Sequence, residues 1–405
     1  MTISGLLDAL LPDPGLTAAL EAARAGSVGA VDVVVPAGAR PLVLAALAAA
    51  APRGAGCPLL VVTATGREAE DVAAALRCYL PPEAVAEFPA WETLPHERLS
   101  PRSDTVGRRL AVLRRLAHPS ADDPVAGPVS VLVAPVRAVM QPVVRGLGDL
   151  HPVGLHVGEE ASLDDVVEAL VAAAYTRTDM VERRGEFAVR GGILDVFPPT
   201  ESHPLRVEFW GDQVEEVRWF SVADQRSLEV AEHGLWAPPC REILLTDEVR
   251  VRAAGLVGEL PGVADMLEKI AAGIAVEGME SLAPVLVDGM EPLLDLMPAH
   301  THLVVVDPEK VRARAHDLVA TSNEFLEASW ANASAGNATP VDLTALDLAE
   351  SSYWPLARLR EHARAIGLPW WTFTALSRDA ELVDVADVAS GDDAQVVTVG
   401  VREVS

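Results

Sequence analysis

The first third of the chain alternates short apolar runs with helical patterns. The apolar runs cover Val31–Val35, Leu59–Val62 and Val129–Ala134, and helical stretches are expected at Leu42–Ala50 and Arg67–Leu80. Strands that are apolar on both faces and alternate with helices are typical of a parallel sheet that is covered on each side. The sequence therefore predicts an α/β body built on a parallel sheet.

The pattern changes beyond about residue 154. Leu163–Ala174 has the spacing of an amphipathic helix, and two extended segments follow at Glu186–Phe197 and Leu205–Phe220. Gly211-Asp212 is a tight-turn signal between alternating runs, so the second segment is expected to form an antiparallel hairpin. The pair Gly191-Gly192 predicts a bulge or bend inside the first segment. These features indicate a small α+β unit.

The α/β character returns beyond roughly Val230, with a buried strand expected at Leu303–Val306 and a helix at Leu356–Ile366. From Asp379 onward the chain has seven acids and one arginine, which predicts an acidic linker. The expected boundaries are therefore residues 1–135 for the first part of the body, 136–225 for the inserted α+β domain, 226–378 for the part that completes the body, and 379–405 for a linker or the start of a next domain.

Composition limits the partners and the compartment. The 405 residues include 32 basic and 59 acidic side chains, a formal net charge of −27. A surface this acidic repels phosphate as a whole, so an anionic partner would need a local basic patch. Three cysteines without a CxxC pair predict neither a disulfide framework nor a cysteine zinc site. The longest apolar stretch, Leu42–Ala51, is too short to cross a bilayer, and a cytoplasmic protein without membrane contact is expected.

The turn from Val35 to Pro41 lies where a motor domain would carry its phosphate-binding loop. It keeps Gly38 but has Arg40 in place of the lysine that reaches the phosphates, and it lacks a Ser or Thr for magnesium. The only lysines, Lys269 and Lys310, both follow glutamates, so no Walker A motif exists in the chain. This turn is interpreted as a degenerate phosphate loop.

Other chemical signals are weaker. His300 and His302 could form a metal pair, but no carboxylate or cysteine stands at ligand spacing, so neither a metal site nor a catalytic residue is expected. A stiff, proline-rich loop precedes a helix that carries Arg108, Arg109 and Arg115. These arginines could contact nucleic acid, or they could form an ordinary solvated face.

A second arginine pair follows the amphipathic helix. If Glu186–Arg190 is a strand, Phe187 and Val189 face the core while Ala188 and Arg190 face outward, and Arg177 can approach Arg190 from the preceding helix end. Paired arginines on a rigid sheet suit a protein interface. Internal salt bridges to nearby acids explain the same pattern equally well.

Two long motifs carry a family resemblance. The run from Trp91 to Pro95, followed by Ser100-Pro101 and Asp104, resembles the N-terminal region of bacterial transcription-repair coupling factors, the Mfd family. The stretches 175–179 and 185–198 resemble the same region, and with 206–212 they are also similar to the excision-repair protein UvrB. The resemblance covers roughly residues 1–375.

The resemblance implies a UvrB-like, degenerate RecA/helicase-like body that does not hydrolyse ATP and needs no cofactor, with an inserted domain that recruits UvrA. It matches the UvrA-contacting arginines to Arg177 and Arg190, with Phe187 and Phe197 as apolar neighbours, and it places Ala188 where UvrB has a further arginine. The alternative, an active UvrB-like ATP-dependent DNA-processing protein, is disfavoured by the degenerate loop and by the lack of a tyrosine cluster. The family's ATP- and magnesium-dependent motor, which contacts stalled RNA polymerase and double-stranded DNA, would lie downstream of Ser405.

Overall fold

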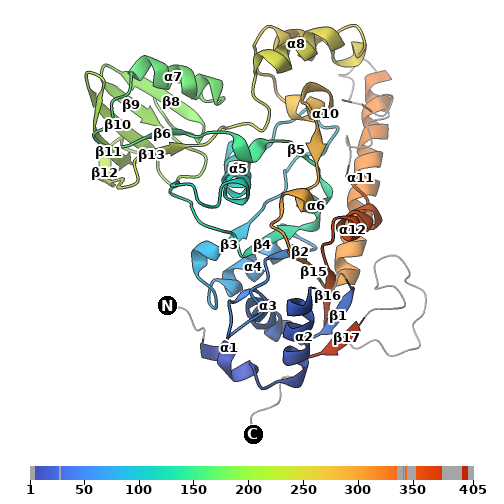
Figure 1. The fold of residues 1–405 in the computed structure, drawn as a ribbon. Coiled ribbons are helices and arrows are strands. Elements are labelled where there is room, and N and C mark those ends of the chain that lie inside the picture. Colours follow the sequence, from blue (N-terminus) through green and yellow to red (C-terminus); the bar gives the residue numbers. More distant parts are fainter. Residues whose placement is uncertain are drawn as a thin grey trace.

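Strands from distant parts of the chain form one seven-stranded sheet in the computed structural model, which describes residues 5–26, 29–334, 341, 343, 353–375 and 395–399. All neighbours are parallel, in the order β17-β1-β16-β15-β2-β4-β3 (Figure 1). The bounds are Val31–Val34 for β1, Leu59–Thr63 for β2, Val85–Glu87 for β3, Val131–Pro135 for β4, His302–Val306 for β15, Trp370–Thr374 for β16 and Gln395–Thr398 for β17. The predicted parallel α/β body is confirmed.

The central strands are apolar at every position because both faces of the sheet are covered. Along β2, Leu60 and Val62 belong to one core cluster, and Leu59 and Val61 belong to the other. The second cluster includes residues of α2 (Pro14–Ala25), α3 (Arg40–Ala48) and α4 (Gly66–Leu76). The first includes residues of α5 (Ser103–Ala117), α6 (Val136–Met140), α8 (Asp247–Leu256), α9 (Ala264–Ala271), α10 (Ala283–Leu286), α11 (Pro308–Ser334) and α12 (Leu356–Ala365).

The inserted domain contains a six-stranded sheet in the order β12-β11-β10-β9-β8-β7, and it projects to one side of the body (Figure 1). Only β7 and β8 run parallel. Its elements are β6 (Val153–Leu155), α7 (Leu163–Ala172), β7 (Thr176–Arg177), β8 (Glu186–Arg190), β9 (Ile193–Val196), β10 (Leu205–Trp210), β11 (Gln213–Phe220), β12 (Ser227–Val230) and β13 (Leu235–Ala237). The predicted hairpin is the pair β10–β11.

The structure moves both boundaries of this domain. Helix α6 and β5 (Val143–Val144), which lie inside the predicted 136–225, belong to the body, since β5 pairs with β14 (Met290–Glu291). Beyond residue 225, β12 adds to the small sheet and β13 pairs with β6. The domain therefore spans about 153–237. The sequence pattern could not show this, because the pairing partners are far apart in the chain.

Two local expectations were also wrong. Gly191-Gly192, where a bulge or bend inside one extended segment was expected, is the turn of a hairpin in which Arg190 pairs with Ile193, so the segment forms two strands. A positive φ of 62° at Gly191 fits a two-residue turn, which glycine adopts without strain. The predicted acidic linker includes β17, which pairs with β1 in the main sheet. Residues 379–394 and 400–405 of that linker lie outside the described part of the chain.

No helix within the described residues is both long enough and apolar enough to cross a membrane. The longest helix of the described chain, α11, has 27 residues and was not among the predicted elements.

A fully buried ion pair joins the body to the segment that leaves the small domain. Arg109 on α5 donates its Nε to Glu242 Oε1 at 2.5 Å, and neither side chain is exposed to solvent. The same oxygen accepts the indole N–H of Trp91 at 2.9 Å, and the guanidinium lies 4.2 Å from the centre of the Phe88 ring. The loop around Trp91, α5 and the chain after β13 therefore meet at one carboxylate.

Replacing Glu242 with alanine is expected to destabilise the protein by about 3–5 kcal/mol, because it leaves the Arg109 guanidinium buried without a counterion. Urea denaturation followed by circular dichroism measures this change. Arg108→Ala is the matched control: Arg108 is the next residue on α5 but is exposed, and its change should stay within about 0.5 kcal/mol. A loss below about 1 kcal/mol for Glu242→Ala would contradict the role of the ion pair.

Candidate partner-binding site

The two arginines of the predicted interface lie at one edge of the small sheet. Strand β7 has only two residues, and Arg177 is in register with Phe187 at the start of β8. Arg190 is the last residue of β8, before the Gly191-Gly192 turn. We call β7, β8 and these two side chains the arginine edge. A sheet edge carries backbone N–H and C=O groups that can pair with another chain.

Alternation along β8 follows the sequence prediction. Phe187 and Val189 pack in the core cluster that the sheet shares with α7, while Ala188 lies in a separate small cluster on the other face. Arg190, two residues after Ala188, takes that other face and is exposed. The predicted alternation is therefore confirmed, but Ala188, which was expected to face outward, is only 2% exposed because a second small cluster covers that face.

The two apolar residues that the resemblance places beside the arginines, Phe187 and Phe197, are both buried. Phe187 is completely buried, and Phe197 is 6% exposed in a cluster with Val181, Ala188 and Phe220. Each aromatic ring fills the interior behind the arginine edge, so neither presents a surface to a partner in this conformation. Phe187 is in register with Arg177, whereas the guanidinium that lies over the Phe197 ring, 5.1 Å from its centre, is that of Arg184.

The guanidinium groups of the arginine edge are not neutralised by carboxylates. Among the described residues, no ion pair involves Arg177 or Arg190; Arg190 donates to the main-chain oxygen of Asp179. The nearby carboxylate of Glu186 instead accepts the backbone N–H groups of Glu182 and Arg183, at 2.8 and 2.9 Å. The internal salt bridges that could have explained this arginine pair are therefore absent from the described structure.

An exposed tryptophan lies on the same face as Arg190. Arg190 pairs with Ile193, Ile193 pairs with Glu208, and Trp210 follows two residues later along β10, so these four side chains share one face. Trp210 is 76% exposed. Trp210 was not among the residues predicted for the interface. The signal was available, however, because Leu205, Val207 and Phe209 fill the inward positions and leave Trp210 outward.

The body holds the base of the small domain closely. Ser103 at the start of α5 donates its hydroxyl to the main-chain oxygen of Arg184 at 3.2 Å. Pro199 lies so close to α5 that a Cβ at Gly107 would stand 2.3 Å from the proline Cβ. Only glycine fits at this contact, which places the arginine edge at a defined position relative to the body.

The three arginines predicted to contact nucleic acid have different environments. Arg109 is the buried partner of Glu242, and Arg115 is 6% exposed with its guanidinium bound to main-chain oxygens of residues 83, 127 and 128. Neither can reach a ligand, because helix α5 turns both into the interior. Only Arg108 is exposed.

The degenerate phosphate loop is closed by an ion pair. Gly38 lies in an exposed turn of 3₁₀ type between β1 and α3, and the following Arg40 is 8% exposed. Its two terminal nitrogens bind the two carboxylate oxygens of Asp307, at 2.8 and 2.6 Å, at the end of β15. Lys310 adds a contact to Asp307 at 3.1 Å. The cation at the mouth of α3 is therefore already neutralised.

The described residues contain no group of three or more His, Cys, Asp or Glu side chains arranged to hold a metal ion. His302 is buried against Trp371, with its Nδ1 3.1 Å from the main-chain oxygen of His300. Burial lowers the pKa of His302, which favours a neutral ring in the core.

Comparison with known proteins adds a family context to this geometry. Residues 153–238 match the family model described as the UvrB interaction domain, which coincides with the structural unit 153–237. Over 393 residues the chain is 50% identical to the transcription-repair-coupling factors of Mycobacterium tuberculosis and Mycobacterium bovis. The chain matches the N-terminal part of transcription-repair-coupling factors.

The match covers 94% of this chain but 31% of each mycobacterial relative, so the chain spans just under a third of their length. The corresponding factor of Escherichia coli is 32% identical over 192 residues, which is 44% of this chain and 16% of that protein. The resemblance seen in the sequence motifs is thereby confirmed.

The ion pair of Asp307 in the degenerate phosphate loop should make the stability of the protein depend on pH. Burial alone raises the pKa of Asp307, but hydrogen bonds and charge from Arg40 and Lys310 outweigh it, and the net pKa lies below its ordinary value. The unfolded state therefore binds the proton more readily, and the stabilisation is present above about pH 4 and lost as pH falls through the lowered pKa. Wild type should exceed Asp307→Asn in stability at pH 7, and the gap should close in strong acid.

Chemical denaturation of both proteins at pH 7, 5, 4 and 3 tests this expectation. Asp247→Asn is the control, because the Asp247 side chain is 95% exposed and its loss should leave stability nearly unchanged at each pH. A gap between wild type and Asp307→Asn that stays constant down to pH 3 would show that the ion pair does not set the acid stability of this site.

Proposed function

We propose that this chain is a non-catalytic docking module that recruits UvrA through the small domain, and so connects stalled RNA polymerase to nucleotide excision repair. The observation that carries the proposal is the arginine edge: two exposed guanidinium groups, free of carboxylate partners among the described residues, on a domain that matches the UvrB interaction domain. The contacts with RNA polymerase and with double-stranded DNA belong, in this proposal, to the longer protein.

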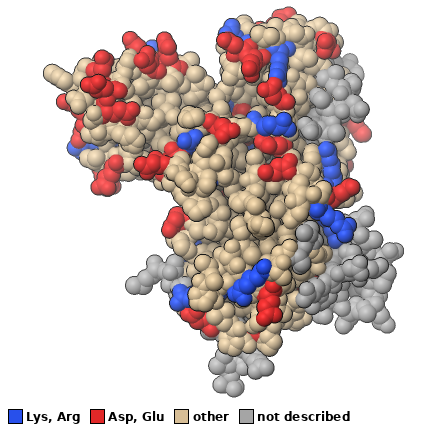
Figure 2. Space-filling view, in the orientation of Figure 1, with Lys and Arg blue, Asp and Glu red and all other residues tan. Residues whose placement is uncertain are grey.

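The physical basis of recognition is local. Groups of acidic side chains are scattered over the visible face of the small domain, where few basic ones appear (Figure 2), so an anionic partner is attracted only where arginines interrupt them. Guanidinium groups form paired hydrogen bonds with carboxylates, and Arg and Trp are the residues most enriched at energetic centres of interfaces. Arg190 and Trp210 share one face, and Arg177 lies on the adjacent edge strand.

Replacing both Arg177 and Arg190 with alanine should weaken UvrA binding by about 2 kcal/mol or more, roughly 30-fold in Kd. Surface plasmon resonance with purified UvrA on the chip and the 405-residue chain in solution measures it. Trp210→Ala should weaken binding as well, through loss of an exposed aromatic contact.

The matched controls are Arg226→Ala and Arg102→Ala, which remove arginines that are 84% and 74% exposed elsewhere on the chain. Both should bind UvrA as the wild type does. The proposal fails if a folded Arg177→Ala/Arg190→Ala chain captures UvrA with undiminished affinity.

The proposal that this chain has no catalytic activity rests on the degenerate phosphate loop, where Arg40 already forms an ion pair with Asp307. A nucleotide would have to break the Arg40–Asp307 pair, and magnesium would still lack a Ser or Thr ligand at this loop. Isothermal titration with ATP and magnesium is expected to give no binding heat. Saturable binding that is lost in Arg40→Ala would instead support the UvrB-like ATP-dependent alternative.

A further inference from the structure

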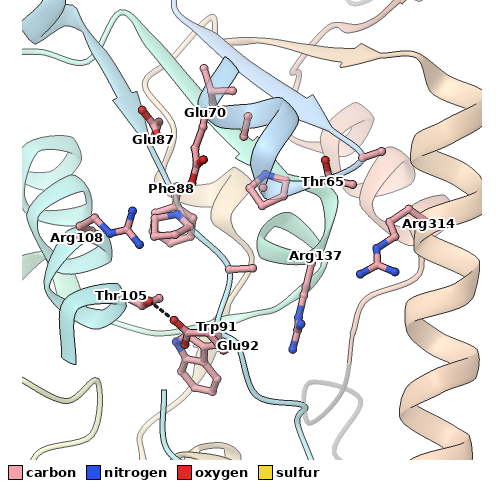
Figure 3. A pocket seen from close by; sticks show the side chains of 17 residues that line it. Thr65, Glu70, Glu87, Phe88, Trp91, Glu92, Thr105, Arg108, Arg137 and Arg314 are labelled. Atoms are coloured by element: carbon pink, nitrogen blue, oxygen red, sulfur yellow. Dashed lines mark hydrogen bonds between the residues drawn. The ribbon is translucent and has the colours of Figure 1, made fainter. Parts of the chain in front are cut away.

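A cavity of about 320 Å³ opens on the body at the carboxyl ends of β2, β3 and β4 (Figure 3). Its lining includes neither the arginine edge nor the Arg40–Asp307 pair. Open parallel sheets bind ligands at the carboxyl ends of their strands, because loops and helix N-termini converge there. The walls come from the β2–α4 turn, the loop after β3, and helices α5, α6 and α11, so the cavity exists only in the folded chain.

Three arginines from three different helices line this cavity. They are Arg108 on α5, Arg137 at the start of α6 and Arg314 on α11. Arg137 and Arg314 lie on the same side as Thr65, and Arg108 lies on the opposite side (Figure 3). Among the described residues, none of the three forms an ion pair with a carboxylate. In a chain with 27 more acids than bases, three converging cations without carboxylate partners are a distinctive arrangement.

Among these three arginines, Arg137 is held in place by hydrogen bonds to neutral groups. Arg137 donates its Nε to the hydroxyl of Tyr353 at 3.0 Å and an Nη2 to the main-chain oxygen of Thr93 at 2.6 Å. Burial raises the pKa of Tyr353, so its hydroxyl remains uncharged at neutral pH. These contacts orient the guanidinium without neutralising it, and its charge is available to a ligand.

The carboxylates of the cavity are largely occupied or distant from this side. Glu87 forms an ion pair with Arg77 at 2.7 Å, and Glu92 accepts the hydroxyl of Thr105. Glu70 and Glu87 lie on the side away from Arg314 (Figure 3). The side with Arg137, Arg314 and Thr65 is thus the cationic part of the cavity.

The start of α4 adds backbone donors to that part. As the first residues of the helix, Gly66 and Arg67 have N–H groups without a partner inside the helix. A Cβ placed at Gly66 would meet nothing within 4 Å, so the space before the helix is open. The N-terminal turn of this 11-residue helix and the side chains of Arg137 and Arg314 line the same cavity. The Glu68 carboxylate caps that turn by accepting the backbone N–H of Thr65 at 3.3 Å, so the arginines supply most of the positive charge.

We propose that this cavity is a phosphate-binding site on the body. Arg137 and Arg314 hold one phosphate group beside the N-terminus of α4, and Arg108 provides a second contact on the far side. The ligand is either a strand of nucleic acid that lays its phosphodiester backbone across the cavity or a small phosphorylated molecule. The site is independent of the UvrA proposal, since no residue is shared.

The test uses the 405-residue chain and two probes: a fluorescent single-stranded oligothymidylate of about 12 nucleotides, and inorganic pyrophosphate. Anisotropy in low salt should show binding of the oligonucleotide, and Arg314→Glu should weaken it at least about tenfold and lower the salt slope by about one. Arg108→Glu, a second exposed position, should weaken it too. Arg226→Glu makes the same charge change on the other domain and should bind as wild type does.

The pyrophosphate arm distinguishes the two sources. Calorimetry measures pyrophosphate binding. If pyrophosphate binds, this binding is lost in Arg314→Glu and the oligonucleotide does not bind, the site belongs to a small phosphorylated ligand. Arg137→Lys should keep part of the affinity in either arm, because it preserves the charge but not the paired donors. The proposal is overturned if neither probe binds at low salt, or if Arg314→Glu and Arg108→Glu bind no differently from Arg226→Glu.

Discussion

The arrangement of the whole molecule depends on one buried carboxylate. Glu242 follows the last strand of the small domain and accepts hydrogen bonds from both Arg109 and Trp91. Because a buried charge without partners is very costly, the loop at Trp91, helix α5 and the chain that leaves the small domain are held in one mutual position. Helix α5 in turn touches Pro199 and Arg184, so the constraint extends to the base of the arginine edge. The position of the arginine edge is thus set by contacts with the body.

The two phosphate-related regions of the body have opposite electrostatics. At the N-terminus of α3, Arg40 forms an ion pair with Asp307. The Asp307 carboxylate therefore supplies the negative charge that a bound anion would supply at this helix end. At the carboxyl ends of β2 to β4, Arg137 and Arg314 have neutral partners or none among the described residues. The same sheet therefore neutralises its arginine at one strand end and leaves arginines without carboxylate partners, among the described residues, at another.

Much of the fold could be predicted from the sequence because its signals are local. Apolar runs such as Leu59–Val62 fixed the class of the body, and the alternation at Phe187 to Arg190 fixed which side chains face outward. The failures concern contacts between distant residues. Arg109 and Arg115 looked like surface positions on a helix, and only Glu242, 133 residues after Arg109, explains why the first is buried. The cavity lined by Arg108, Arg137 and Arg314 was not predicted for the same reason, since only the tertiary fold brings Arg137 and Arg314 to one cavity.

Strand β17 has a consequence for how the body can be dissected. It covers the outer edge of β1, and α2 lies so close that a Cβ at Gly15 would stand 1.9 Å from the main-chain oxygen of Thr398. A shortened version that stops before residue 395 would lose this cover, and the hydrogen-bonding groups of β1 would become a template for a neighbouring molecule. Expression fragments designed to isolate the body therefore remain monodisperse only when they carry their own closing strand.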